Sequence, residues 1–159
     1  MKLMTISDKG LELIKAFEGC KLFAYRDSVG VATIGYGHTK GVRMGQAITQ
    51  QQADEFLRED LAGCEKQLNS LGINFRQEQF DALCSWLFNL GWANFRNSTM
   101  LKYILAGRDD VEITDQLVRW FNAGGQPLKG LKRRRIAEAN IFLGREAYYL
   151  DSKEQIRRR

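Results

Sequence analysis

Apolar residues recur at helical spacing near the start of the chain. Leu11, Ile14 and Phe17 fall on one face, and Ser7 stands where a residue that caps a helix N-terminus is expected. The periodicity stops at Glu18, just before a glycine, which is common beyond helix C-termini. The sequence therefore predicts a first helix that ends at Glu18.

The pattern changes between residues 20 and 45. β-favouring side chains such as Phe23, Tyr25, Val31 and Ile34 are interrupted there by repeated glycines. Strand-forming residues bounded by turn residues are typical of hairpins. We expect a short antiparallel hairpin or a three-stranded sheet.

A long amphipathic segment follows the hairpin. Thr49 and Gln52 have the spacing of a capping box, and one apolar stripe continues as far as Leu71. Beyond it, Asn74 and Gln77 resemble a second capping box, and apolar periodicity predicts helices near 77–91, 98–105, 110–122 and 131–143. These elements predict an α+β fold in one domain, with an N-terminal lobe (about 1–48), a connecting helix (about 49–72) and an all-α C-terminal lobe (about 73–159).

Composition narrows the class of protein. The chain has 159 residues, of which 44% are hydrophobic and 27% charged, as in a soluble globular protein. Its net charge of +5 favours nucleic acid, an anionic membrane or an acidic polysaccharide as a partner. Cys20, Cys64 and Cys84 lack the spacing of a disulfide framework or a metal site. The N-terminal residues contain no apolar run long enough for a signal peptide or a membrane span.

Glu18, Asp27 and Thr33 are the candidates for chemistry. At the last turn of a helix, and beside Phe17, Leu22 and Phe23, Glu18 would tend to keep its proton, as a general acid must. Asp27 lies in a polar turn, where it would stay ionised and orient a water molecule. Taken singly, each has an ordinary alternative: a solvated helix-end glutamate, an aspartate that binds turn amides, and a strand threonine.

The surrounding motif joins the three residues. The segment FEGCKLFAYRDSVGVATIGYGHT resembles the signature of phage-type lysozymes, the endolysins of glycoside hydrolase family 24. In that signature a Glu, eight residues, an Asp, five residues and a Thr precede IGYGHT. Glu18, Asp27 and Thr33 match it, and QFDALCSWLFNLG and RWFNAGGQPLKGLKRRRIAEANIF resemble later family segments.

The resemblance implies a lysozyme-like fold and hydrolysis of the β-1,4 bond between N-acetylmuramic acid and N-acetylglucosamine in peptidoglycan. Glu18 would protonate the leaving oxygen, while Asp27 and Thr33 position a water molecule on the opposite face, with inversion at the anomeric carbon. Neither a metal nor an organic cofactor is implied. A lytic transglycosylase and a catalytically inactive wall-binding or nucleic-acid-binding domain are the alternatives.

Other residues receive supporting roles. We expect His38, the only histidine, to form an ion pair with Asp60 of the connecting helix. The resemblance suggests that Arg134 pairs with Glu18 across the cleft, which would favour the ionised form of the acid. Asn89 and Trp92 are candidate substrate contacts. The basic run at 132–135 lacks interleaved aromatic residues, which argues against nucleic acid as the partner.

The biological setting follows from the same resemblance. Without a signal peptide, the enzyme would accumulate as a monomer in the cytoplasm of a host bacterium and would not insert into membranes. A holin-type membrane permeabiliser would then give it access to the wall, and host lysis would follow.

Overall fold

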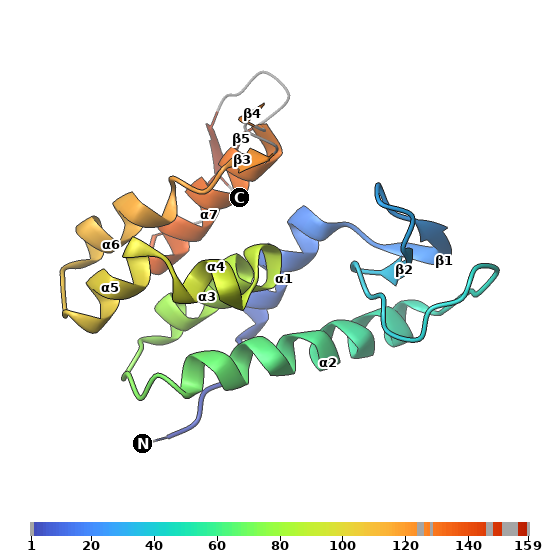
Figure 1. Ribbon diagram of the computed structural model, residues 1–159, viewed down its shortest axis with the longest axis horizontal. Helices are drawn as coiled ribbons and strands as arrows, with labels where there is room; N and C mark the ends of the chain where they lie inside the picture. The colour runs from blue at the N-terminus through green and yellow to red at the C-terminus, as the bar shows by residue number, and fades with distance from the viewer. Residues whose placement is uncertain (1, 124–125, 128, 146–147, 151–155, 159) are drawn as a thin grey trace.

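The computed structural model describes residues 2–123, 126–127, 129–145, 148–150 and 156–158. Within these residues it combines α-helices with short antiparallel strand pairs, so the predicted α+β class is confirmed (Figure 1). The helices are α1 (Asp8–Glu18), α2 (Gln50–Asn69), α3 (Gln77–Leu90), α4 (Trp92–Arg96), α5 (Thr99–Leu105), α6 (Asp110–Leu117) and α7 (Lys129–Phe142). The strands are β1 (Lys21–Arg26), β2 (Ala32–Gly35), β3 (Asn122–Ala123), β4 (Gln126–Pro127), β5 (Tyr148–Leu150) and β6 (Ile156–Arg158).

Helix α1 is fixed at its N-terminus to α3. The Ser7 hydroxyl accepts a hydrogen bond from the backbone N–H of Gly10 and donates one to Asp81, which also accepts the Ser7 N–H at 2.9 Å. At Gly10 an added Cβ would lie 2.6 Å from Ile6 and 2.8 Å from Asp81, so this contact has no room for a side chain. The position of Glu18, at the other end of α1, therefore depends on close packing against α3.

Strands β1 and β2 form an antiparallel hairpin. Tyr25 pairs with Thr33, and an irregularity lies between Lys21 and Tyr25. On the other edge of β1, Phe23 forms an isolated bridge with Ala47. The structure thus has the hairpin form of the prediction, with one bridge where a third strand was the alternative.

Helix α2 runs from the hairpin end of the molecule to the helical end (Figure 1). The predicted capping box is present: Gln52 N–H donates to the Thr49 hydroxyl, and the Gln52 side chain accepts the Thr49 N–H. Its apolar stripe buries Ala53, Leu57, Leu61 and Leu68. One continuous helix therefore connects the two ends, as the periodicity predicted.

Helix α3 is the centre of the helical part. Every residue from Phe80 to Leu87 is buried, because α1, α2, α4 and α7 all pack against this helix. The capping box predicted at Asn74 and Gln77 is wrong: the helix starts at Gln77, and Gln79 accepts the Arg76 N–H at 2.9 Å.

Two other helices differ from the predicted pattern. Helix α6 ends at Leu117, short of the predicted 122, and α4 is a separate short helix. None of the described helices is both long and apolar enough to cross a membrane.

Candidate active site

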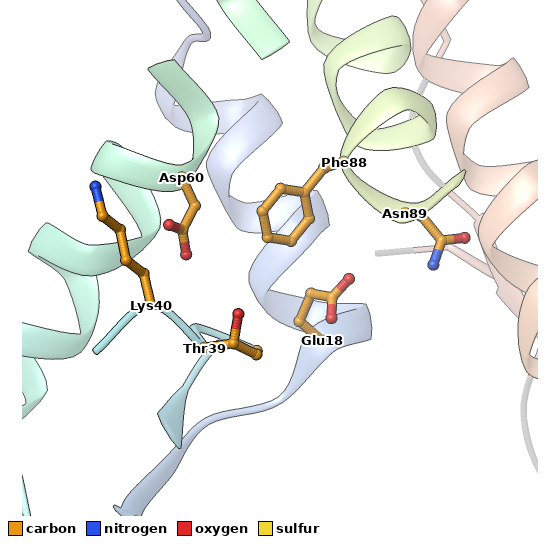
Figure 2. A pocket seen from close by; sticks show the side chains of 7 residues that line it. Glu18, Thr39, Lys40, Asp60, Phe88 and Asn89 are labelled. Atoms are coloured by element: carbon orange, nitrogen blue, oxygen red, sulfur yellow. The ribbon is translucent and has the colours of Figure 1, made fainter. Parts of the chain in front are cut away.

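A cleft opens beside the C-terminal end of α1. Its cavity, of about 320 Å³, lies between that helix end, the loop after β2, α2 and α3 (Figure 2). The lining residues are Glu18, Gly37, Thr39, Lys40, Asp60, Phe88 and Asn89. Two carboxylates, an amine, an amide and an aromatic ring thus face one polar space.

Glu18 is the carboxylate on the α1 side of this cleft. Helix α1 stops there because Gly19 adopts φ 69°, a left-handed conformation that glycine tolerates without strain. The Glu18 side chain is 21% exposed, and its Oε1 lies 2.6 Å from Nη1 of Arg134. Glu18 is therefore accessible from the cleft and held in place from the protein side.

Arg134 belongs to a buried ionic cluster on α7. We define this cluster as Arg134, Arg135 and Glu138, whose side chains are 4%, 0% and 0% exposed. Glu138 Oε2 lies 3.4 Å from Arg134 Nε and 3.2 Å from Arg135 Nη2, and it also accepts the Ser85 hydroxyl of α3. Two residues of the basic run at 132–135 thus point into the protein and are not available to a surface partner.

Burial acts against both signs of charge in the cluster. It raises the pKa of Glu138, an effect that the two neighbouring guanidinium groups oppose, and it lowers the pKa of Arg135. Arg135 Nε lies 2.9 Å from Glu138 Oε1 without the geometry of a hydrogen bond, so that contact is electrostatic. Each charge of the cluster lies against a charge of the opposite sign, which offsets part of the cost of burying it.

Asp27 lies in the hairpin turn that follows β1. Its Oδ1 accepts the backbone N–H of Val29 at 3.0 Å and that of Val31 at 2.9 Å. The Thr33 hydroxyl, on β2, donates to the Val31 carbonyl oxygen at 2.8 Å. Val31 therefore connects Asp27 with Thr33, whereas neither residue lines the cavity beside Glu18.

His38 and Asp60 join the loop after β2 to α2. His38 Nδ1 lies 2.9 Å from Asp60 Oδ2, and the ring stacks on Phe56 with centroids 4.2 Å apart. His38 is only 7% exposed at its side chain, whereas Asp60 is 27% exposed and also lines the cleft. This contact fixes the loop that carries Thr39 and Lys40 along the cleft wall.

The two candidate substrate contacts lie in different places. Asn89 lines the cleft, and its Oδ1 accepts a hydrogen bond from Arg135 Nη2 at 2.7 Å. Trp92 starts α4 and stacks on Phe95, with centroids 5.6 Å apart, and does not line this cavity.

The sequence had given no role to Lys40 or Glu138, and Arg135 was named only as part of the basic run at 132–135. Lys40 directly follows the IGYGHT motif, and Glu138 follows the arginine pair within the late segment, so sequence position offered a signal in both cases. In the part of the chain that the structure describes, no group of His, Cys, Asp and Glu side chains is arranged to hold a metal ion.

Known proteins resemble this chain over most of its length. The profile of the phage lysozyme family matches residues 15–138. The endolysin of Acyrthosiphon pisum secondary endosymbiont phage 1 is 43% identical, with 87% of this chain and 98% of the endolysin aligned. The endolysin of Salmonella phage P22 is 39% identical, with 89% of this chain and 99% of the endolysin aligned.

Solved structures show the same fold. The muramidase domain of SpmX from Asticaccaulis excentricus superimposes with a TM-score of 0.81 and 39% sequence identity, covering 87% of this chain and 97% of that domain. At this level of likeness the predicted lysozyme-like architecture is confirmed.

Proposed function

The chain belongs to the phage lysozyme family and is a lysozyme, a glycoside hydrolase, and we propose that it is an endolysin whose substrate is bacterial peptidoglycan. The bond attacked is the β-1,4 bond between N-acetylmuramic acid and N-acetylglucosamine. The observation that carries this proposal is Glu18, which faces a polar cleft and is held by a buried arginine.

Glu18 is the general acid in this proposal. Glycosidic cleavage requires a proton on the leaving oxygen as the bond breaks. The carboxyl group of Glu18 is accessible from the cleft, while Arg134 stabilises the carboxylate that remains after the proton has left. Glu18 therefore has the exposure and the partner that proton donation needs.

Asp27 and Thr33 position the attacking water. Asp27 Oδ1 is occupied by two backbone N–H groups, so its other oxygen is the one that orients water. The Thr33 hydroxyl already donates to Val31, which leaves its lone pairs to accept a hydrogen bond from the same water. Attack from the face opposite Glu18 inverts the anomeric carbon, and such pairs have carboxyl groups about 6.5–9.5 Å apart.

The remaining walls of the cleft hold the sugar. Asn89 offers an amide to the polar groups of the substrate, and Phe88 offers an aromatic surface. We propose that Trp92 contacts the substrate only when the glycan strand is long enough to extend past the cavity. The His38–Asp60 pair supports the loop opposite.

The proposed setting is the cytoplasm of a bacterial host, where the enzyme accumulates as a monomer. A holin-type membrane permeabiliser releases it to the wall, and degradation of peptidoglycan lyses the cell. No nucleic acid, membrane insertion, metal or organic cofactor takes part in this proposal.

Digestion of purified peptidoglycan tests the function. We expect fragments with reducing muramic acid ends, and proton NMR of the first products should show the α-anomer before mutarotation. Anhydro ends, lighter by one water, would identify a lytic transglycosylase. Binding to the wall without cleavage would identify an inactive wall-binding domain.

A further inference from the structure

The buried ionic cluster lies directly behind two residues of the cleft. Arg134 Nη1 donates to Glu18 at 2.6 Å, and Arg135 Nη2 donates to Asn89 at 2.7 Å. Glu138 contacts both guanidinium groups from the opposite side. Glu138 is therefore connected to the proposed acid, Glu18, through one side chain, that of Arg134. It is connected to the Asn89 amide of the cleft wall through one side chain, that of Arg135.

We propose that Glu138 is a positioning residue of the cleft, which sets the charge that Glu18 experiences and the orientation of the Asn89 amide. The proposal rests on the proposed function of Glu18 as general acid. Glu138 is fully buried and does not line the cleft, so it affects the cleft only through the residues that it contacts, which are Arg134, Arg135 and Ser85.

The balance of charge carries the first part of the proposal. Two guanidinium groups are matched by two carboxylates, Glu18 and Glu138, when both acids are ionised. When Glu18 holds its proton, Glu138 is the one charged carboxylate left in contact with the two arginines, within the part of the chain that the structure describes. Without the Glu138 charge, two guanidinium groups would favour the ionised form of Glu18, and Glu18 would then have no proton to give to the leaving oxygen.

The other charged groups around Glu18 do not replace Glu138. Lys40 and Asp60 face Glu18 from the opposite wall of the cleft, from the loop after β2 and from α2. One is a cation and the other an anion that already contacts His38. α3 contributes the uncharged Ser85 and Asn89. Glu138 is therefore the group in direct contact that offsets the positive charge of both arginines.

The orientation of Asn89 carries the second part. An asparagine amide can turn either its oxygen or its NH₂ group toward a neighbour. A guanidinium group only donates hydrogen bonds, so the amide oxygen must face it. Arg135 holds that oxygen, which points away from Glu18 in Figure 2. The NH₂ group of Asn89 is thereby left as a hydrogen-bond donor for the substrate.

Glu138→Gln tests the charge, because glutamine keeps the shape of glutamate and its acceptor for Ser85. We expect the titration midpoint of the Glu18 carboxyl, followed by carbon NMR, to move down by about one pH unit. The alkaline limb of kcat/KM for peptidoglycan fragments should move by the same amount, with activity at neutral pH lower by about tenfold. Glu112→Gln, the same change at an exposed ion pair on α6, should leave both profiles unchanged.

The double variant Arg135→Met with Glu138→Gln separates charge from packing. It removes one charge of each sign from the cluster, an exchange that buried ion pairs often tolerate. We expect the Glu18 midpoint to return to that of the wild type, while KM rises because Asn89 has lost its anchor. The double variant also tests the proposal if the single variant does not fold.

Two results would overturn the inference: an unchanged Glu18 midpoint in a folded Glu138→Gln, or a shifted midpoint in the charge-balanced double variant. The NMR measurement does not need activity. If the wild type fails to cleave peptidoglycan, the proposed function is refuted, and the NMR midpoints of Glu18 still decide whether Glu138 sets the charge that Glu18 experiences.

Discussion

The two carboxylates proposed for the chemistry are held in opposite ways. Glu18 is contacted by Arg134, 116 residues further along the chain, and Arg134 is in turn contacted by Glu138, which has no exposed surface. Asp27 is held by the N–H groups of Val29 and Val31, two and four residues away, in an exposed turn. The position of Glu18 thus depends on the whole helical part, and that of Asp27 on its own turn.

The surroundings follow the same division. On the helical side, Phe80, Leu83 and Trp86 have no exposed surface. On the hairpin side, Phe23 is 73% exposed and Val29 is 81% exposed. A residue far from the cleft can therefore disturb Glu18 through packing, whereas Asp27 should respond only to changes in the hairpin.

Glu18→Gln should have the largest effect on activity. Glutamine can still accept a hydrogen bond from Arg134, so the fold is kept, but it has no acidic proton to give. We expect peptidoglycan cleavage, measured as new reducing ends, to fall about 10³-fold with little change in melting temperature. Glu12→Gln, at an exposed position of the same helix, is the matched control. Activity within tenfold of the wild type would remove Glu18 from the role of acid.

Asp27→Asn should come next. Asparagine retains the Oδ1 acceptor for Val29 and Val31 and so preserves the turn, but it loses the charge that orients water. We expect about a 10²-fold loss of kcat with KM nearly unchanged, since the change affects the reaction more than binding. Loss of activity together with loss of the hairpin amide signals in NMR would instead indicate a structural role for Asp27.

The same division explains what the sequence could predict. The cap at Ser7, the Thr49–Gln52 box and the β1–β2 hairpin depend on neighbours within a few residues, and all three occur as predicted. Helix α3 is different, because it is buried on all sides. Its start at Gln77 accompanies tertiary contacts of Arg76 with Asp110 and Phe142, which no local pattern contains.

The candidate site divides in the same way. The motif spacing made Glu18, Asp27 and Thr33 candidates for the chemistry, and the resemblance suggested that Arg134 contacts Glu18, as it does in the structure. Neither the spacing nor the resemblance gave Glu138 a role, because an acidic residue four positions after an arginine usually lies on a solvated helix face. Trp92 was a candidate substrate contact, but it stacks on Phe95 within α4 and does not line the cavity beside Glu18.

Gly30→Ala tests whether the hairpin turn alone holds Asp27. Gly30 adopts φ 88°, and an added Cβ would meet nothing within 4 Å, so the cost is backbone strain of about 1–2 kcal/mol. If that strain displaces the turn, activity should fall by up to about tenfold. Gly63→Ala, in α2 and with equally open space, should leave activity unchanged and stabilise the helix slightly. Equal activity of both variants would show that the position of Asp27 does not depend on this turn.

Thiol labelling compares the two sides of the molecule without any substitution. Cys84 lies in buried α3, Cys64 is partly buried in α2, and Cys20 lies between α1 and β1. Burial raises the pKa of Cys64 to about 11, with smaller contributions from Glu65 and Asp60, and it raises the pKa of Cys84 further. Because the thiolate is the reactive form, iodoacetamide at pH 8 should modify Cys20 first, and Cys64 labelling should speed up about tenfold per pH unit. Peptide mass spectrometry follows each site; Cys84 labelling as fast as Cys20 in the folded protein would show that the helical side opens as readily as the hairpin side.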